Sequence, residues 1–136
     1  MGENKGVLRI LLIDDDLDMR VVISALIKQL WKCVELEVAA GGREALQKLD
    51  GHDFDVVLTD IQMPEMDGYA TAAAIRQLPP PHCNINIICM TGGKLSVEKL
   101  QEAGIDGYLL KPFSLEDLRF KLSEIRAAPL YLRDDG

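Results

Sequence analysis

Acidic residues follow two apolar runs of the chain. Asp14, Asp15 and Asp16 come directly after residues 8–13, and Asp60 comes directly after residues 55–59. Short runs of β-branched and aliphatic residues are typical of strands that are buried on both faces. A single aspartate at the end of such a strand is most simply a loop cap. A chemical role for Asp60 therefore depends on which other side chains lie beside it.

Two more polar residues end later apolar runs. Thr91 follows residues 85–90, and Lys111 follows residues 107–110. In an open α/β sheet of parallel strands, ligands and chemistry gather at the carboxyl ends of the strands. We therefore expect the carboxylates, the hydroxyl and the ammonium group to converge at one edge of a sheet.

This set of side chains suits phosphoryl transfer. Two carboxylates about 4 Å apart repel by roughly 4 kcal/mol at an effective dielectric constant near 20, and one lysine neutralises only one of them. A hard divalent cation, Mg²⁺ or Mn²⁺, is the expected occupant. Thr91 and Lys111 suit phosphoryl oxygens, and Asp60 is then a nucleophile that becomes an aspartyl phosphate.

Strand and helix patterns alternate five times along the chain. The pattern predicts strands over residues 8–13, 34–40, 55–59, 85–90 and 107–110. It predicts helices over residues 19–30, around 45–49, and over 68–78, 96–103 and 115–125. Right-handed crossovers place the helices on both faces of a parallel sheet. The predicted fold is α/β, a doubly wound five-stranded parallel sheet, with the half-exposed strand 34–40 at an edge.

Composition excludes several functional classes. The 136 residues fit one domain, and a net charge of −7 disfavours direct binding to nucleic acid or to anionic membranes. The apolar run 7–13 contains Arg9 and is too short for a membrane span or a signal sequence. Three cysteines, Cys33, Cys83 and Cys89, form no paired motif and are expected to be reduced, mostly buried thiols. These features favour a cytoplasmic protein.

Four stretches of the sequence resemble the response-regulator receiver domain of two-component signalling. They are Leu-Ile-Asp-Asp-Asp at 12–16, Thr-Asp-Ile-Gln-Met-Pro-Glu-Met-Asp-Gly at 59–68, Met-Thr-Gly at 90–92 and Gly-Tyr-Leu-Leu-Lys-Pro-Phe at 107–113. The chain is most similar to stand-alone chemotaxis-type regulators and to the receivers of hybrid kinases. The resemblance implies a flavodoxin-like (βα)5 fold with strand order 2-1-3-4-5. It places the receiver domain at residues 7–128, after a flexible N-terminus (1–6) and before a tail (129–136).

The resemblance also implies a phosphorylation site and a metal site. Asp60 would accept a phosphoryl group from a sensor histidine kinase or a histidine phosphotransfer protein. Asp15 and Asp60 would bind Mg²⁺ directly, Asp14 would act largely through water, and Gln62 would supply its main-chain carbonyl. Such a protein catalyses only its own phosphorylation and slow dephosphorylation, so it is not expected to be an enzyme in the usual sense.

A switch is implied as well. Lys111, held by a cis bond to Pro112, would pair with Asp60 and later with the phosphoryl group. The hydroxyl of Thr91 would move toward that group, and the ring of Tyr108 would follow into the vacated space. The face formed by the fourth helix, fifth strand and fifth helix would then bind an output partner that the sequence does not identify. A phosphorylation-dependent homodimer stays open, as does the question of a stand-alone protein or part of a larger one.

Two glycines depart from the family pattern. Gly92 stands where the family usually has alanine or another small residue, and Gly93 follows it. Two glycines in succession favour a loose loop between the fourth strand and the fourth helix. We predict that this loop is mobile when Asp60 is not phosphorylated.

Other functions fit less well. A haloacid-dehalogenase-like Mg²⁺-dependent phosphatase or phosphotransferase also uses an aspartate nucleophile. That family carries Asp-x-Asp-x-Thr/Val after its first strand, and the run at 14–18 lacks the final residue. A degenerate receiver that acts only as a docking scaffold is disfavoured because no site residue is missing. A nucleotide-binding fold is weaker still, since no glycine-rich phosphate loop follows the first strand.

Several polar residues have simpler roles. Asp16 and Asp18 are both candidates to cap helix 19–30, and for Asp18 this role is favoured. Asp67 is favoured as the cap of helix 68–78. Residues 114–117 resemble a capping box for the last helix. Trp31 is expected to pack at the end of the first helix.

Overall fold

The computed structural model describes residues 7–124, which contain one five-stranded parallel sheet. The strands are β1 (Leu8–Ile13), β2 (Val34–Ala39), β3 (Val56–Asp60), β4 (Asn86–Thr91) and β5 (Gly107–Leu110). The helices are α1 (Leu17–Leu30), α2 (Gly42–Leu49), α3 (Gly68–Arg76), the 3-10 helix η1 (His82–Asn84), α4 (Val97–Ala103) and α5 (Leu115–Ser123). The strand order is β2-β1-β3-β4-β5. The predicted doubly wound α/β fold with order 2-1-3-4-5 is therefore confirmed.

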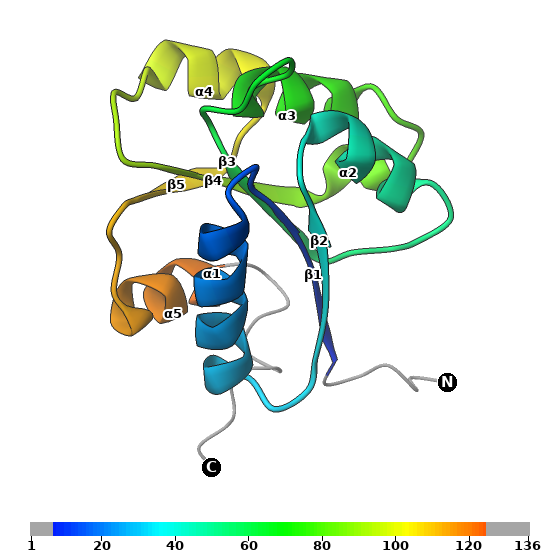
Figure 1. Ribbon diagram of the computed structural model, residues 1–136. Helices are drawn as coiled ribbons and strands as arrows, with labels where there is room; N and C mark the ends of the chain where they lie inside the picture. Colours follow the sequence, from blue (N-terminus) through cyan, green and yellow to red (C-terminus); the bar gives the residue numbers. More distant parts are fainter. Residues whose placement is uncertain (1–6, 125–136) are drawn as a thin grey trace.

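Helices cover both faces of the sheet. In Figure 1, α1 and α5 lie on one face, and α2, α3 and α4 lie on the other. Side chains of β1 alternate between these layers: Ile10 and Leu12 pack toward α1 and α5, and Leu11 and Ile13 pack on the opposite face. All four are fully buried. This two-sided burial explains why the strand sequence is continuously apolar.

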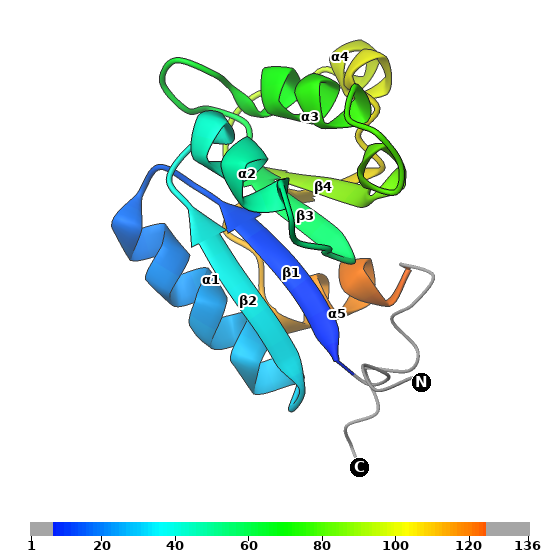
Figure 2. The ribbon, with the colours of Figure 1, turned by 90° about the vertical axis from the view of Figure 1, so that its right-hand side faces the viewer.

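The edge position of β2 is also confirmed. β2 pairs only with β1 in the sheet, and Glu35 and Glu37 on it are exposed. Figure 2 shows β1 and β2 side by side with their arrowheads at the same end. All neighbouring strands of this sheet pair in parallel, so the carboxyl ends of the five strands lie at one edge.

The helix caps agree with the sequence in two cases and differ in one. Asp67 caps α3 by accepting a hydrogen bond from the amide of Ala70, and Ser114 and Asp117 form the predicted capping box of α5. Asp18 as the cap of α1 is wrong. The helix begins at Leu17, two residues earlier than predicted, so the other candidate, Asp16, is the cap and accepts from the amide of Asp18 at 2.9 Å.

Trp31 is buried at the end of α1, as predicted. The expectation of mostly buried thiols is wrong, because Cys89 is buried, Cys83 is partly exposed and Cys33 is exposed. Cys33 lies in the bend between α1 and the edge strand β2. None of the helices within residues 7–124 is long and apolar enough to cross a membrane. The N-terminal segment 1–6, Ile125 of the predicted last helix and the tail 129–136 lie outside the described residues.

Candidate functional site

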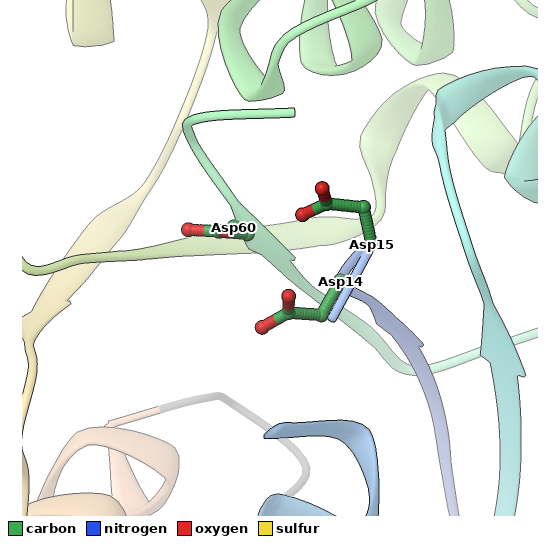
Figure 3. A group of neighbouring side chains, drawn as sticks. All are labelled: Asp14, Asp15 and Asp60. Carbon is green, nitrogen blue, oxygen red and sulfur yellow. The ribbon is translucent and has the colours of Figure 1, made fainter. Parts of the chain in front are cut away.

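Three carboxylates meet at the carboxyl edge of the sheet. Asp14 and Asp15 follow β1, and Asp60 is the last residue of β3 (Figure 3). One carboxylate oxygen from each residue lies within 4.8 Å of the others. The central neighbours in the sheet, β1 and β3, thus bring together residues that are 45 positions apart in the chain.

Lys111 directly follows β5, and its side chain reaches this cluster from the end of that strand. Its amide donates to the carbonyl of Thr91 at 2.8 Å, so the end of β5 is tied to the end of β4. Its ammonium nitrogen Nζ lies 3.2 Å from Oδ2 of Asp14 and 3.5 Å from Oδ1 of Asp60. The Lys111–Pro112 bond is cis, as predicted. A single ammonium group therefore serves two carboxylates.

Asp14 is held by protein groups on every side. Its amide donates to the carbonyl of Ala39 at 3.1 Å, and its own carbonyl accepts from Nη1 of Arg20 at 2.7 Å. Its Oδ1 accepts from the amide of Asp16 at 3.0 Å, and its Oδ2 accepts from Lys111. The side chain is fully buried. Both carboxylate oxygens of Asp14 are already engaged, which favours an indirect part in metal binding.

Asp60 and Asp15, in contrast to Asp14, have carboxylate oxygens that make no hydrogen bond within residues 7–124. Oδ1 of Asp60 accepts from the amide of Ile61 at 2.9 Å, whereas its Oδ2 has no hydrogen bond within residues 7–124. Asp15 is exposed and makes no hydrogen bond to any other described residue. Burial raises the pKa of Asp60; the ammonium of Lys111 opposes this effect and the negative charge of Asp14 adds to it. The open oxygen atoms of the site are thus on Asp15 and Asp60.

Gly68 lets helix α3 approach Asp60. A Cβ atom at this position would lie 2.4 Å from the main-chain oxygen of Asp60 and 2.8 Å from Cα of Ile61. The amide of Gly68 also donates to the carbonyl of Ile61 at 2.8 Å. The loop after Asp60 therefore closes tightly onto the start of α3, and only glycine fits without a backbone shift.

The other predicted residues lie around this centre. Thr91 is buried, and its Oγ1 accepts from the amide of Gly93 at 3.1 Å. Gln62 follows Ile61 in the loop, and no hydrogen bond between described residues uses its main-chain carbonyl. Tyr108 is not brought into the cluster. The residue is 41% exposed, and its ring lies beside α5, with Nζ of Lys121 5.6 Å from the ring centre.

The donor set fits a divalent metal ion. The cluster holds three carboxylates but one lysine ammonium, which pairs with Asp14 and Asp60, so negative charge is in excess. The free donors are carboxylate and carbonyl oxygens, the ligands that Mg²⁺ prefers. An acidic cluster of this kind is typical of the Mg²⁺ site of receiver domains.

A parallel sheet in the order 2-1-3-4-5, with acidic residues, a threonine and a lysine at its carboxyl edge, defines the class of receiver-type α/β proteins. The sequence profile described as "Response regulator receiver domain" matches residues 10–123. The chain belongs to this family, the receiver domains of two-component systems. The family match leaves the haloacid-dehalogenase alternative without support.

Known relatives agree with this assignment. The probable transcriptional regulator ycf27 of Cyanidium caldarium is 30% identical over 90% of this chain and 48% of its own length. The structure of the chemotaxis protein CheY4 of Vibrio cholerae has a TM-score of 0.80 and 31% identity, covering 88% of this chain and 98% of that one. The chain spans about half the length of ycf27.

A third relative carries a metal ion. The receiver domain of the sensor histidine kinase PA1611 of Pseudomonas aeruginosa has a TM-score of 0.77 and 28% identity, covering 87% of this chain and 96% of that one. Its structure contains a magnesium ion coordinated in the active-site cleft.

Proposed function

We propose that this receiver domain is a phosphoacceptor switch that takes up a phosphoryl group on Asp60. The observation that carries the proposal is that the three carboxylates differ in their hydrogen bonds and ion pairs. Both oxygens of Asp14 are engaged by protein groups, and Asp15 has no ion pair with Lys111 among residues 7–124. Asp60 combines an ammonium group near Oδ1 with a free Oδ2. It is the carboxylate best placed to act as nucleophile.

The transfer is a substitution at phosphorus. A carboxylate oxygen of Asp60 forms a bond to phosphorus while the bond to a nitrogen of a phosphohistidine breaks. The bonding electrons stay with the imidazole, which can then take up a proton. Lys111 is placed to bind the phosphoryl oxygens, and Thr91 supplies a hydroxyl donor at the end of β4. The donor would be a sensor histidine kinase or a histidine phosphotransfer protein.

Asp15, Asp60 and the main-chain carbonyl of Gln62 would hold Mg²⁺, and Asp14 would contribute largely through water. Mn²⁺ has the same preference for oxygen ligands and is expected to substitute. A divalent cation bound there would neutralise charge on the carboxylates and on the transferring phosphoryl group.

The output would come from a rearrangement around Thr91. In the present state its hydroxyl accepts from Gly93, and Tyr108 lies on the surface of β5. Movement of the hydroxyl toward a phosphoryl group would break the first contact and open space for the tyrosine ring. The face of α4, β5 and α5 already exposes Leu110 and Phe120, which suits an apolar output partner or a second copy of the chain.

We also infer that the domain works in the cytoplasm, where its phosphodonors are found, and that it extends over residues 7–128. Its catalytic activity would be limited to its own phosphorylation and dephosphorylation. No nucleic acid or membrane is an expected partner of so acidic a chain, which carries a net charge of −7.

Intact-mass measurement after incubation with Mg²⁺ and acetyl phosphate tests the proposal. One phosphoryl group should be added, it should be lost in hydroxylamine, and it should be absent from Asp60→Asn. Asp53→Asn is the matched control, because Asp53 is an exposed aspartate outside the cluster. A label that persists in Asp60→Asn, or turnover of a simple phosphate ester, would contradict the proposal.

A further inference from the structure

Arg20 makes a contact with the site that its position in the sequence does not suggest. It lies in the first turn of α1, where its amide donates to the carbonyl of Asp16 at 3.0 Å. Its guanidinium turns back toward the sheet, and Nη1 donates to the main-chain carbonyl of Asp14 at 2.7 Å. The side chain is half-buried. Arg20 thus binds the main chain of the acidic loop and not one of its carboxylates.

This carbonyl controls the direction of Asp15. The carbonyl of Asp14 and the amide of Asp15 belong to one planar peptide unit, so a hydrogen bond to the carbonyl fixes the orientation of the whole unit. On the near side, the amide of Asp14 is held by Ala39 at 3.1 Å. On the far side, Asp15 itself makes no hydrogen bond within the described part of the chain, and the following amide, that of Asp16, donates to Oδ1 of Asp14 at 3.0 Å. Arg20 is therefore the described side chain that hydrogen-bonds the Asp14–Asp15 peptide unit itself, whereas the Asp14 carboxylate holds the amide that follows Asp15.

We propose that Arg20 is a positioning residue for the cation site, because it holds the Asp14–Asp15 peptide so that the carboxylate of Asp15 faces Asp60. The inference rests on the proposed function, since it assigns Arg20 to the same metal and phosphorylation site. Without this hydrogen bond the peptide can rotate, and the free carboxylate of Asp15 spends less time within reach of Asp60.

The positive charge of Arg20 and its hydrogen bond to Asp14 have opposite effects on the affinity for Mg²⁺. A positive guanidinium near the acidic cluster disfavours a second cation, so its removal by itself would strengthen Mg²⁺ binding. Loss of positioning would weaken it. The sign of the change therefore separates a positioning role from a purely electrostatic one.

The test compares Mg²⁺ affinity by titration calorimetry in the wild type, Arg20→Met and Lys28→Met. Lys28 is the matched control, because it is an exposed cation on the same helix with no ion pair in residues 7–124. We expect Arg20→Met to bind Mg²⁺ about 10-fold more weakly or worse, as is typical when a group that orients a metal ligand is lost. Lys28→Met should bind like the wild type, and Arg20→Lys should recover part of the affinity.

Phosphorylation by acetyl phosphate at increasing Mg²⁺ gives a second measurement. Arg20→Met should need a higher Mg²⁺ concentration for half-maximal rate and should approach the wild-type rate at saturation. Unchanged or tighter Mg²⁺ binding in Arg20→Met would overturn the inference. If that variant does not fold, Arg20→Gln decides in the same way, because its shorter side chain also loses the contact. A wild-type chain that neither binds Mg²⁺ nor accepts the phosphoryl group would instead contradict the proposed function.

Discussion

Lys111 and Asp14 form a buried ion pair, with Nζ 3.2 Å from Oδ2. The side chain of Asp14 is fully buried and that of Lys111 is 18% exposed. The same ammonium lies 3.5 Å from Asp60. A phosphoryl group on Asp60 would add negative charge beside the ammonium of Lys111, so it would draw this ammonium away from Asp14 and toward Asp60. The ion pair with Asp14 thus keeps the ammonium of Lys111 close to Asp60, the residue that we propose is phosphorylated.

Loss of Lys111 should destabilise the metal-free protein. Lys111→Met leaves the buried charge of Asp14 without its partner, and breaking a buried pair in this way costs about 3 kcal/mol of the free energy of unfolding. Urea denaturation at neutral pH without Mg²⁺ measures the loss. Lys48→Met is the control, because its pair with Glu37 is on the surface and such pairs contribute less than about 1 kcal/mol. Equal losses in the two variants would contradict the buried pair.

Replacement of Asp60 should stabilise the metal-free protein in a pH-dependent way. Burial raises the pKa of Asp60 in the folded state, with Lys111 opposing and Asp14 adding to the shift. The unfolded chain therefore releases this proton more readily, and ionisation favours unfolding as the pH rises through the folded-state pKa. Without Mg²⁺, we expect Asp60→Asn to melt at a higher temperature than the wild type at neutral pH. The difference should narrow toward about pH 4, where the aspartate is increasingly protonated in both states.

Calorimetric melting curves of the wild type and Asp60→Asn between about pH 4 and neutral pH give the sign of the difference in melting temperature. Asp53→Asn serves as the control, because Asp53 is an exposed aspartate outside the cluster. A wild type that is more stable than Asp60→Asn at every pH would show that ionised Asp60 is stabilised and not penalised in the fold.

Two glycines near the site should differ in their tolerance of a side chain. Gly68→Ala would place Cβ 2.4 Å from the carbonyl oxygen of Asp60, so we expect a loss of about 2 kcal/mol or more. A Cβ atom at position 92 would have the Cβ of Lys111 as its nearest neighbour, at 3.7 Å, which is an ordinary van der Waals contact. Gly92→Ala should therefore change the free energy of unfolding by about 0.5 kcal/mol or less. Chemical denaturation of both variants measures this, and similar losses would contradict the close approach of α3.

The loop that follows Thr91 should be loose before phosphorylation. Gly92 and Gly93 allow many backbone conformations, and the amide of Gly93 is held by a side-chain oxygen, Oγ1 of Thr91. We expect the amides of residues 92–94 to exchange with solvent faster than those of β3 and β4. Amide exchange followed by NMR tests this, and protection equal to that of the strands would rule it out. Movement of the Thr91 hydroxyl on phosphorylation should further lower the protection of Gly93.

The three cysteines should react with thiol reagents in a fixed order. Cys33 is exposed and Cys83 is partly exposed, whereas burial raises the pKa of Cys89 to about 12. The thiolate is the reactive form, so Cys89 should be modified only when the chain unfolds. Modification by dithionitrobenzoate in native buffer should consume Cys33 first, and Cys33→Ser should remove the fast phase. A Cys89 that reacts at the rate of Cys33 in the folded protein would contradict its burial.

The sequence alone determined the architecture and the identity of the residues that meet at the site. Continuous apolar runs marked strands buried on both faces, and the residue type at the end of each run placed Asp14, Asp60, Thr91 and Lys111 at one edge. The direction of parallel strands brings such ends together whatever the packing details are. The caps at Asp67 and Ser114 could also be predicted, because they depend on local backbone geometry.

Only the tertiary structure decided how these residues are partnered. It pairs Lys111 with Asp14 as well as with Asp60, and it directs Arg20 to a main-chain carbonyl. It also leaves Cys33 exposed. Every residue has a main-chain carbonyl, so the residue types in a sequence do not indicate which carbonyl a distant side chain such as Arg20 will contact. Side-chain rotamers and exposure follow from packing between elements that are distant in the chain, and these are fixed only when the whole domain is folded.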